Sequence, residues 1–167
     1  MSVRKLSLAG ILVAVGVVCS TFYIPIGVSK VFPVQHFINV MAGVILGPAY
    51  AVAMAFVTSL LRNLMGTGSL LAFPGSMCGA LLCGLLYKYS GKLGFAFLGE
   101  VIGTGIIGAL AAYPVAALFL SSEAAFYGFV LPFGISSLAG ALISISLLMA
   151  LKKAGILQKL IYGDQVS

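Results

Sequence analysis

Long apolar stretches, separated by short polar or glycine- and proline-rich breaks, run through the whole sequence. A helix of about 20 apolar residues spans the roughly 30 Å hydrocarbon core of a membrane. This pattern predicts an all-α membrane protein in which one domain, residues 1–167, forms a bundle of six transmembrane helices. The predicted spans are residues 6–24, 33–46, 49–65, 71–87, 94–120 and 132–151.

The breaks between these spans predict further detail. A short polar loop is expected over residues 26–30, and the second span is short for a full crossing. Pro114 is expected to kink or end the fifth span, because proline lacks the N–H that the helix ladder needs. Residues 121–129 are of mixed polarity, and we predict a short helix at the membrane surface there.

Composition excludes a soluble domain. Of the 167 residues, 62% are hydrophobic and 7% are charged, whereas soluble domains carry about 25% charged residues. The three cysteines lie inside apolar runs and, with one histidine, form no zinc-binding spacing. HExxH, paired aspartates and a Walker motif are also absent from the sequence. We therefore expect no enzymatic activity, no cofactor and no metal.

The basic residues predict how the bundle is oriented. Lys and Arg concentrate in the cytoplasmic loops of membrane proteins. Six spans with a cytoplasmic N-terminus place seven of the nine basic residues inside, and a five-span arrangement loses this agreement. The seven are Arg4, Lys5, Lys88, Lys92, Lys152, Lys153 and Lys159. We therefore predict that both termini are cytoplasmic and that the protein lies in a prokaryotic cell membrane. Because the charges are scattered, nucleic-acid binding is not expected.

Polar side chains inside a membrane are costly and are therefore candidates for function. With six spans, most of them fall at the outer end of the bundle. The candidates for ligand contact there are His36, Asn39, Arg62, Asn63, Ser69, Tyr113 and Tyr127, with Lys30, Thr67, Glu123, Ser136 and Ser137 nearby. Each has a structural alternative: Arg62 could reach the lipid headgroups, Glu123 could be a solvated loop charge, and the tyrosines could be interfacial belt residues.

Glu100 differs from these candidates because it lies near the inner start of the fifth span, with Thr104 one turn further on the same face. A buried carboxylate needs a partner or must take up a proton. Glu100 and Thr104 are therefore candidates for a polar contact at the base of a cavity. A coupling contact to a partner protein and a bond to a neighbouring helix are the alternatives. Tyr113 is on a different face of a regular helix and is not expected to share a small ligand with Glu100.

Small residues predict close helix packing. The chain has 21 glycines, and small residues let helices approach each other in lipid. In the fifth span these are Gly99, Gly103, Gly105 and Gly108, for which internal packing is a sufficient explanation. The first span carries two small-xxx-small pairs, Gly10 with Ala14 and Gly16 with Ser20. Such a face could also dock a second membrane protein.

The chain resembles a known family over nearly its whole length. The small size, the glycine-rich spans and the first helix with Gly10 and Ala14 are similar to the substrate-binding S components of energy-coupling factor (ECF) vitamin transporters. Three longer segments most resemble the ThiW branch, which is assigned to the thiazole precursor of thiamine. They are residues 32–39 (FPVQHFIN), 62–75 (RNLMGTGSLLAFPG) and 99–105 (GEVIGTG).

The resemblance implies a pocket near the outer face and docking of the first helix, through Gly10 and Ala14, onto a transmembrane T component driven by two ATPase subunits. Thiamine-binding relatives use several tryptophans, but this chain has none. This departure favours a smaller neutral ligand, hydroxyethylthiazole, over thiamine. Phe32, Phe73 and Phe133 could supply an aromatic wall for its ring.

Two alternatives stay open from the sequence. The first is an S component for another vitamin or precursor, such as hydroxymethylpyrimidine or thiamine. The second belongs to a different class, a small self-associating channel or exporter. A channel would need polar residues along a continuous path across the bilayer, whereas the polar residues here gather at one end.

Overall fold

Helices make up most of the chain in this computed structural model, which describes residues 3–26, 29–119 and 126–163. The side chains at positions 25, 26, 29 and 30 are outside the description, and so is Glu123 with most of the predicted surface helix. The helices are α1 (Val3–Val18), the 3-10 turn η1 (Cys19–Thr21), α2 (Pro33–Ile45), α3 (Pro48–Leu64), α4 (Ala72–Ser90), α5 (Leu93–Ile102), the π-helix η2 (Gly103–Gly108), α6 (Ala109–Phe119), α7 (Val130–Lys153) and α8 (Ile156–Tyr162).

Proline and glycine set the ends of several helices. α2 and α3 both begin at a proline, Pro33 and Pro48, whose fixed φ suits a first turn and whose missing N–H is not needed there. Gly91 follows α4 with a φ of 65°, a left-handed conformation that costs glycine little. These residues place α2, α3 and α4 within a few positions of the predicted spans.

The fifth predicted span is one continuous stretch of helix, Leu93–Phe119, built from α5, η2 and α6. Pro114 lies inside α6, so the expectation that it could end the helix is wrong. The irregularity instead falls at η2, whose backbone is π-helical. A Cβ at Gly103 would lie 2.8 Å from the carbonyl oxygen of Cys78, so a glycine at this position lets η2 approach α4 closely.

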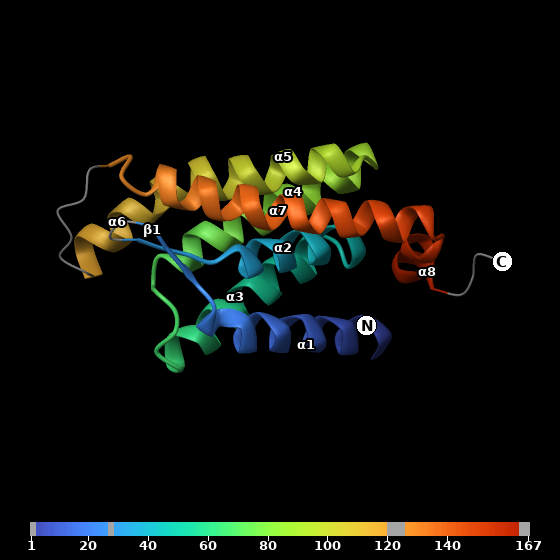
Figure 1. Cartoon of the computed structure of the whole chain (residues 1–167), viewed down its shortest axis with the longest axis horizontal. Coiled ribbons are helices and arrows are strands. Elements are labelled where there is room, and N and C mark those ends of the chain that lie inside the picture. Colours follow the sequence, from blue (N-terminus) through green and yellow to red (C-terminus); the bar gives the residue numbers. More distant parts are fainter. Residues whose placement is uncertain (1–2, 27–28, 120–125, 164–167) are drawn as a thin grey trace.

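A short hairpin replaces the predicted polar loop between the first two spans. β1 (Ile24–Ile26) pairs antiparallel with β2 (Ser29–Val31), with Ile24 opposite Val31. Isoleucine and valine favour extended backbone, which explains why α1 and η1 end at Thr21 rather than at position 24. In Figure 1 the hairpin lies toward the end of the molecule that carries α6.

Three stretches of helix in the described chain are long and apolar enough to cross a membrane. They are Val3–Thr21, Leu93–Phe119 and Val130–Lys153. α2, with 13 residues, is shorter, as expected. The six-span count therefore stays a prediction, whereas the helical, apolar character of the bundle is confirmed.

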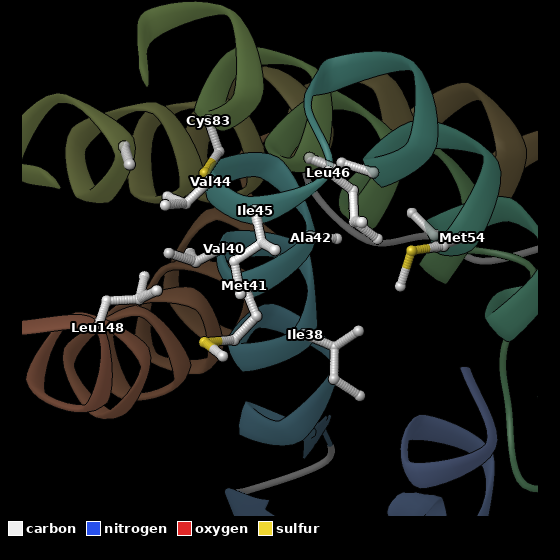
Figure 2. Close-up of a cluster of buried hydrophobic side chains, with 14 of the residues drawn as sticks. Ile38, Val40, Met41, Ala42, Val44, Ile45, Leu46, Met54, Cys83 and Leu148 are labelled. Carbon is white, nitrogen blue, oxygen red and sulfur yellow. The ribbon is translucent and has the colours of Figure 1, made fainter. Parts of the chain in front are cut away.

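α2 is the central helix, buried from Ile38 to Ile45. Figure 2 shows its apolar side chains spreading toward the surrounding helices, with Cys83 of α4, Met54 of α3 and Leu148 of α7 around them. Gly140 of α7 faces the backbone of Pro33, where a Cβ would clash with the Pro33 carbonyl oxygen. Close packing from several sides fixes the position of α2.

α1 is attached more loosely than the other long helices. Only 17% of its span is buried, against 39% for Leu93–Phe119. Its two small-residue pairs have different surroundings. Gly16 packs inward, where a Cβ would lie 2.9 Å from Cδ1 of Ile38, whereas Gly10 is exposed and a Cβ there would meet nothing within 4 Å. Ala14 is exposed as well.

Most of the basic residues gather at one end of the bundle. α1 begins there beside α8, and an Arg4 nitrogen donates to the carbonyl oxygen of Lys159 at 2.8 Å. The α4–α5 turn and the end of α7 lie at the same end in Figure 1, and they carry Lys88, Lys92, Lys152 and Lys153. The start of α7 and the hairpin lie at the opposite end.

Candidate functional site

A cavity of about 470 Å³ lies between α2, α3, α4, η2 and the first turns of α7. Its aromatic wall consists of Phe32, Phe129 and Phe133. The polar side chains that line it are Gln35, His36, Arg62, Thr67, Ser69, Ser76, Thr104 and Ser136. Apolar walls with a few polar groups, in a volume of about 300–1,000 Å³, are typical of small-molecule sites.

Glu100 lies directly behind the part of the wall that His36 and Thr104 form. Its side chain is fully buried, and Oε1 accepts hydrogen bonds from His36 Nδ1 at 2.8 Å, Asn39 Nδ2 at 3.0 Å and Thr104 Oγ1 at 3.0 Å. A buried carboxylate is costly unless it is hydrogen-bonded, so these contacts hold α5 against α2. Glu100 thus makes the predicted bond to a neighbouring helix, immediately next to the cavity.

The contact with Glu100 also orients the histidine. When Nδ1–H donates to the carboxylate, Nε2 of the neutral imidazole is left as a hydrogen-bond acceptor. His36 is 7% exposed and lines the cavity. In that tautomer, His36 offers the wall of the cavity an acceptor for a ligand hydroxyl or N–H group.

Gly79 of α4 makes room for this polar cluster. A Cβ at Gly79 would clash with Oγ1 of Thr104 and would lie 2.9 Å from each carboxylate oxygen of Glu100. Asn39 completes the cluster on the side of α4, where its Nδ2 donates to the carbonyl oxygen of Ser76 at 3.1 Å. The cluster thus joins α2, α4 and the α5–η2 helix behind the cavity.

Arg62 lines another part of the cavity and is only 2% exposed. Its Nη1 donates to Oε1 of Gln35 at 3.0 Å, and its guanidinium carbon lies 4.2 Å from the centre of the Phe32 ring. Stacking on an aromatic face is a favourable position for a guanidinium. This burial argues against the alternative in which Arg62 reaches the lipid headgroups.

The loop after α3 closes the cavity beside Arg62. The backbone N–H groups of Thr67 and Gly68 both donate to the carbonyl oxygen of Arg62 at 2.9 Å. A Cβ at Gly68 would lie 2.8 Å from the backbone nitrogen of Asn63, so the tight fold of this loop needs a glycine. The Thr67 hydroxyl lies 2.8 Å from that of Ser20, which ties the loop to η1.

A family model described as "Thiamine-precursor transporter protein (ThiW)" matches residues 6–154, which include every residue that lines this cavity. The chain belongs to the ThiW family. Neither a curated protein nor a solved structure matches it. ThiW is a family of thiamine-precursor transporters, and the three long apolar helices fit a membrane protein.

Eight of the side chains that the sequence named meet at the cavity of this ThiW protein. They are Phe32, His36, Arg62, Thr67, Ser69, Thr104, Phe133 and Ser136. Asn39 and Glu100 support the wall from behind. The sequence placed Glu100 apart from His36 and Asn39, and this separation is wrong, because the carboxylate accepts hydrogen bonds from both side chains.

Four other candidates for ligand contact do not line the ThiW cavity. Asn63 instead holds the loop after α3, donating to the carbonyl oxygens of Ser59 and Ser69 at 2.8 and 3.1 Å. Three aromatic side chains lie elsewhere: Phe73 packs on Phe56, Tyr113 packs edge-on against Phe126, and Tyr127 is 73% exposed. None of the four contributes to the lining of the cavity.

The sequence did not single out Gln35 and Phe129. Gln35 lies one residue before His36, and the histidine drew attention because it is the only one in the chain. A glutamine inside an otherwise apolar helix is itself a signal of function, because its amide is costly to bury. Phe129 comes from the turn before α7, where the sequence pattern is mixed and gives no register.

Proposed function

We propose that this ThiW protein is the substrate-binding S component of an ECF-type importer and that its ligand is hydroxyethylthiazole, the thiazole precursor of thiamine. The observation that carries the proposal is the cavity, which combines phenylalanine walls with the oriented His36. The family supplies the class of cargo, and the cavity supplies a site of suitable chemistry.

The chemistry of the ligand matches the two kinds of wall. A thiazole ring has an aromatic face that can stack between phenylalanines such as Phe32 and Phe133. Its ring nitrogen accepts a hydrogen bond, and the donors nearby belong to Gln35 and Arg62. Its hydroxyl can donate to Nε2 of His36, which the bond to Glu100 leaves free in the neutral tautomer.

Charge favours a precursor over thiamine itself. Among the described residues that line the cavity, Arg62 carries a positive charge and none is a carboxylate. Thiamine carries a permanent positive charge on its thiazolium ring, which this guanidinium would repel in a poorly screened site. Hydroxyethylthiazole is uncharged and avoids that repulsion.

We also propose that the chain crosses the membrane six times with both termini in the cytoplasm. The gathering of basic residues at the end that carries α8 supports this orientation, because such residues favour the cytoplasmic side. The cavity then opens toward the outside of the cell, where an importer meets its cargo. The shorter α2, with 13 residues, would cross only part of the bilayer.

The exposed face of α1 is the proposed docking surface for the T component, which two ATPase subunits would drive. Gly10 and Ala14 are exposed, whereas Gly16 is used for packing within the chain. A helix that is only 17% buried can present most of its surface to another membrane protein. Small residues on that surface allow close helix contact.

Calorimetric titration of the purified protein in detergent tests the ligand. We expect hydroxyethylthiazole to bind, with thiamine and hydroxymethylpyrimidine at least about 100-fold weaker, which corresponds to roughly 2.8 kcal/mol. Tight binding of hydroxymethylpyrimidine alone would overturn the proposed ligand but keep the transporter class. Ion conductance of the chain alone in vesicles would instead favour the channel alternative.

A further inference from the structure

Three hydrogen-bond donors beside the cavity have no partner among the described residues. They are Nε and Nη2 of Arg62 and Nε2 of Gln35. Both side chains line the cavity and are nearly fully buried, at 2% and 4% exposed. A buried donor without an acceptor is costly, and a buried charge without a counter-charge is more so.

The free nitrogens of Arg62 form one edge of its guanidinium. Nη1 is already engaged by Gln35, and Phe32 covers one face of the plane. Nε and Nη2 point in the same direction and make the fork to which a carboxylate or phosphate binds through two parallel hydrogen bonds. Glu100 is the only carboxylate among the described side chains, and its bonded oxygen is held by His36, Asn39 and Thr104, so no described carboxylate occupies this fork.

The volume of the cavity leaves room for an additional group. About 470 Å³ is within the range that holds drug-sized ligands, and a one-ring alcohol is smaller than those. An acidic substituent on the thiazole could therefore reach the fork while the ring remains between the phenylalanines. The three nitrogens are themselves closed off from solvent, so the Arg62–Gln35 pair must turn toward the cavity to receive it.

We propose that Arg62 and Gln35 form an anion subsite, so that the cavity binds acidic thiazoles, with a carboxylate or a phosphate ester on the side chain, more tightly than the neutral alcohol. This inference rests on the proposed function for the ring and adds a class of substrate to it. The carboxylate and the phosphate share the same chemistry at the fork, and separate titrations distinguish them.

The test compares three probes on the purified wild-type protein. They are hydroxyethylthiazole, its phosphate ester, and the acid in which a carboxymethyl group replaces the hydroxyethyl group. Hydrogen bonds to charged groups are worth enough to give a preference of about 10- to 100-fold for one of the acids. Arg62→Gln removes the fork and should bring the acid and the alcohol to within about threefold of each other. Equal affinities in the wild-type protein would overturn the subsite.

Gln35→Glu provides a second variant that does not depend on removing a buried arginine. The new carboxylate takes the place of the Gln35 amide beside Arg62 and supplies an internal counter-charge. We expect it to raise the unfolding temperature and to abolish the preference for the acids. An undiminished preference in Gln35→Glu would contradict the proposal, even if Arg62→Gln fails to fold.

The same titrations separate this inference from the proposed function. If the alcohol binds and the acids bind no better, the anion subsite fails and the thiazole ligand stands. If no thiazole binds at all, the proposed ligand fails. Whether Arg62 binds an anion is then tested by comparing hydroxymethylpyrimidine with its phosphate ester. A preference for the ester that Gln35→Glu removes would support the anion subsite. Equal binding of the two compounds would overturn it.

Discussion

Several side chains in the two halves of α2 are buried to a similar degree but lie among different neighbours. In the first half, Gln35, His36 and Asn39 are 4%, 7% and 1% exposed, and each is hydrogen-bonded to a side chain on another helix. In the second half, Val40 and Val44 are 0% and 3% exposed and meet only the apolar core (Figure 2).

This comparison teaches that burial alone does not identify a site. Apolar side chains in the second half stabilise the bundle through close packing, which any well-fitting core provides. Polar side chains in the first half are costly to bury, and their hydrogen bonds offset that cost only in part. We infer that the first half of α2 serves ligand binding and that the second half serves stability.

The largest effect is expected from Glu100→Ala, which acts on the first half. The variant leaves the donors of His36, Asn39 and Thr104 without their shared acceptor, and each buried polar group left unsatisfied costs about 1–3 kcal/mol. We expect a lower unfolding temperature and a loss of hydroxyethylthiazole binding by calorimetry. Glu100→Gln keeps an acceptor oxygen and serves as the milder control. Normal ligand affinity in Glu100→Ala would show that the polar cluster is not needed for binding.

Leu148→Ala tests the apolar second half of α2. This α7 side chain is fully buried beside the apolar part of α2, and truncating such a leucine costs about 2–5 kcal/mol. Denaturant unfolding should show that loss, while the Kd for ligand in the remaining folded protein stays within about threefold of wild type. A drop in affinity as large as that of Glu100→Ala would show that the two halves are not separate in function.

A smaller effect is expected from Ser136→Ala, at the junction between the hairpin and α2. The Ser136 hydroxyl accepts the backbone N–H of Phe32 at 2.9 Å, and losing one such bond costs about 1 kcal/mol. Because Phe32 is part of the aromatic wall, ligand affinity should fall by about five- to tenfold. The matched control on the same helix is Ser146→Ala, whose exposed hydroxyl bonds only within α7. Equal effects of the two variants would rule out a role for this junction.

The smallest effect on the chain itself is expected from Gly10→Leu. Nothing lies within 4 Å of a Cβ there, so the free energy of unfolding should change by less than about 0.5–1 kcal/mol and ligand binding should persist. Co-purification with the T component should nevertheless be lost. Gly16→Leu is the contrasting variant, since its side chain would meet Ile38 and Thr58 and should destabilise the fold. Intact assembly of Gly10→Leu would place the docking surface elsewhere.

Much of the fold could be predicted from the sequence because apolar runs and their proline and glycine breaks are local signals. The prediction of a helix over residues 49–65 compares with Pro48–Leu64, and that over 132–151 compares with Val130–Lys153. The hairpin and the π-helix were not predicted. The hairpin depends on the pairing between its two strands, and the π-helix depends on its packing against α4. Neither kind of contact can be seen in a local sequence pattern.

The site could be predicted only in part, because sequence position gives depth in the membrane but not the direction of a side chain. His36 and Arg62 were selected for their polarity and do line the cavity. Tyr113 was selected on the same grounds, yet it packs against Phe126. The bond between His36 and Glu100 was beyond sequence reasoning, because it depends on where the hairpin places the start of α2.

A structure of the purified protein with hydroxyethylthiazole bound would test the central claim most directly, namely that the cavity in front of Glu100 is the transport site. We expect the thiazole ring between Phe32 and Phe133, with the ligand hydroxyl within hydrogen-bond distance of Nε2 of His36. A ligand bound outside this cavity, or a cavity that stays empty at saturating ligand, would contradict the account.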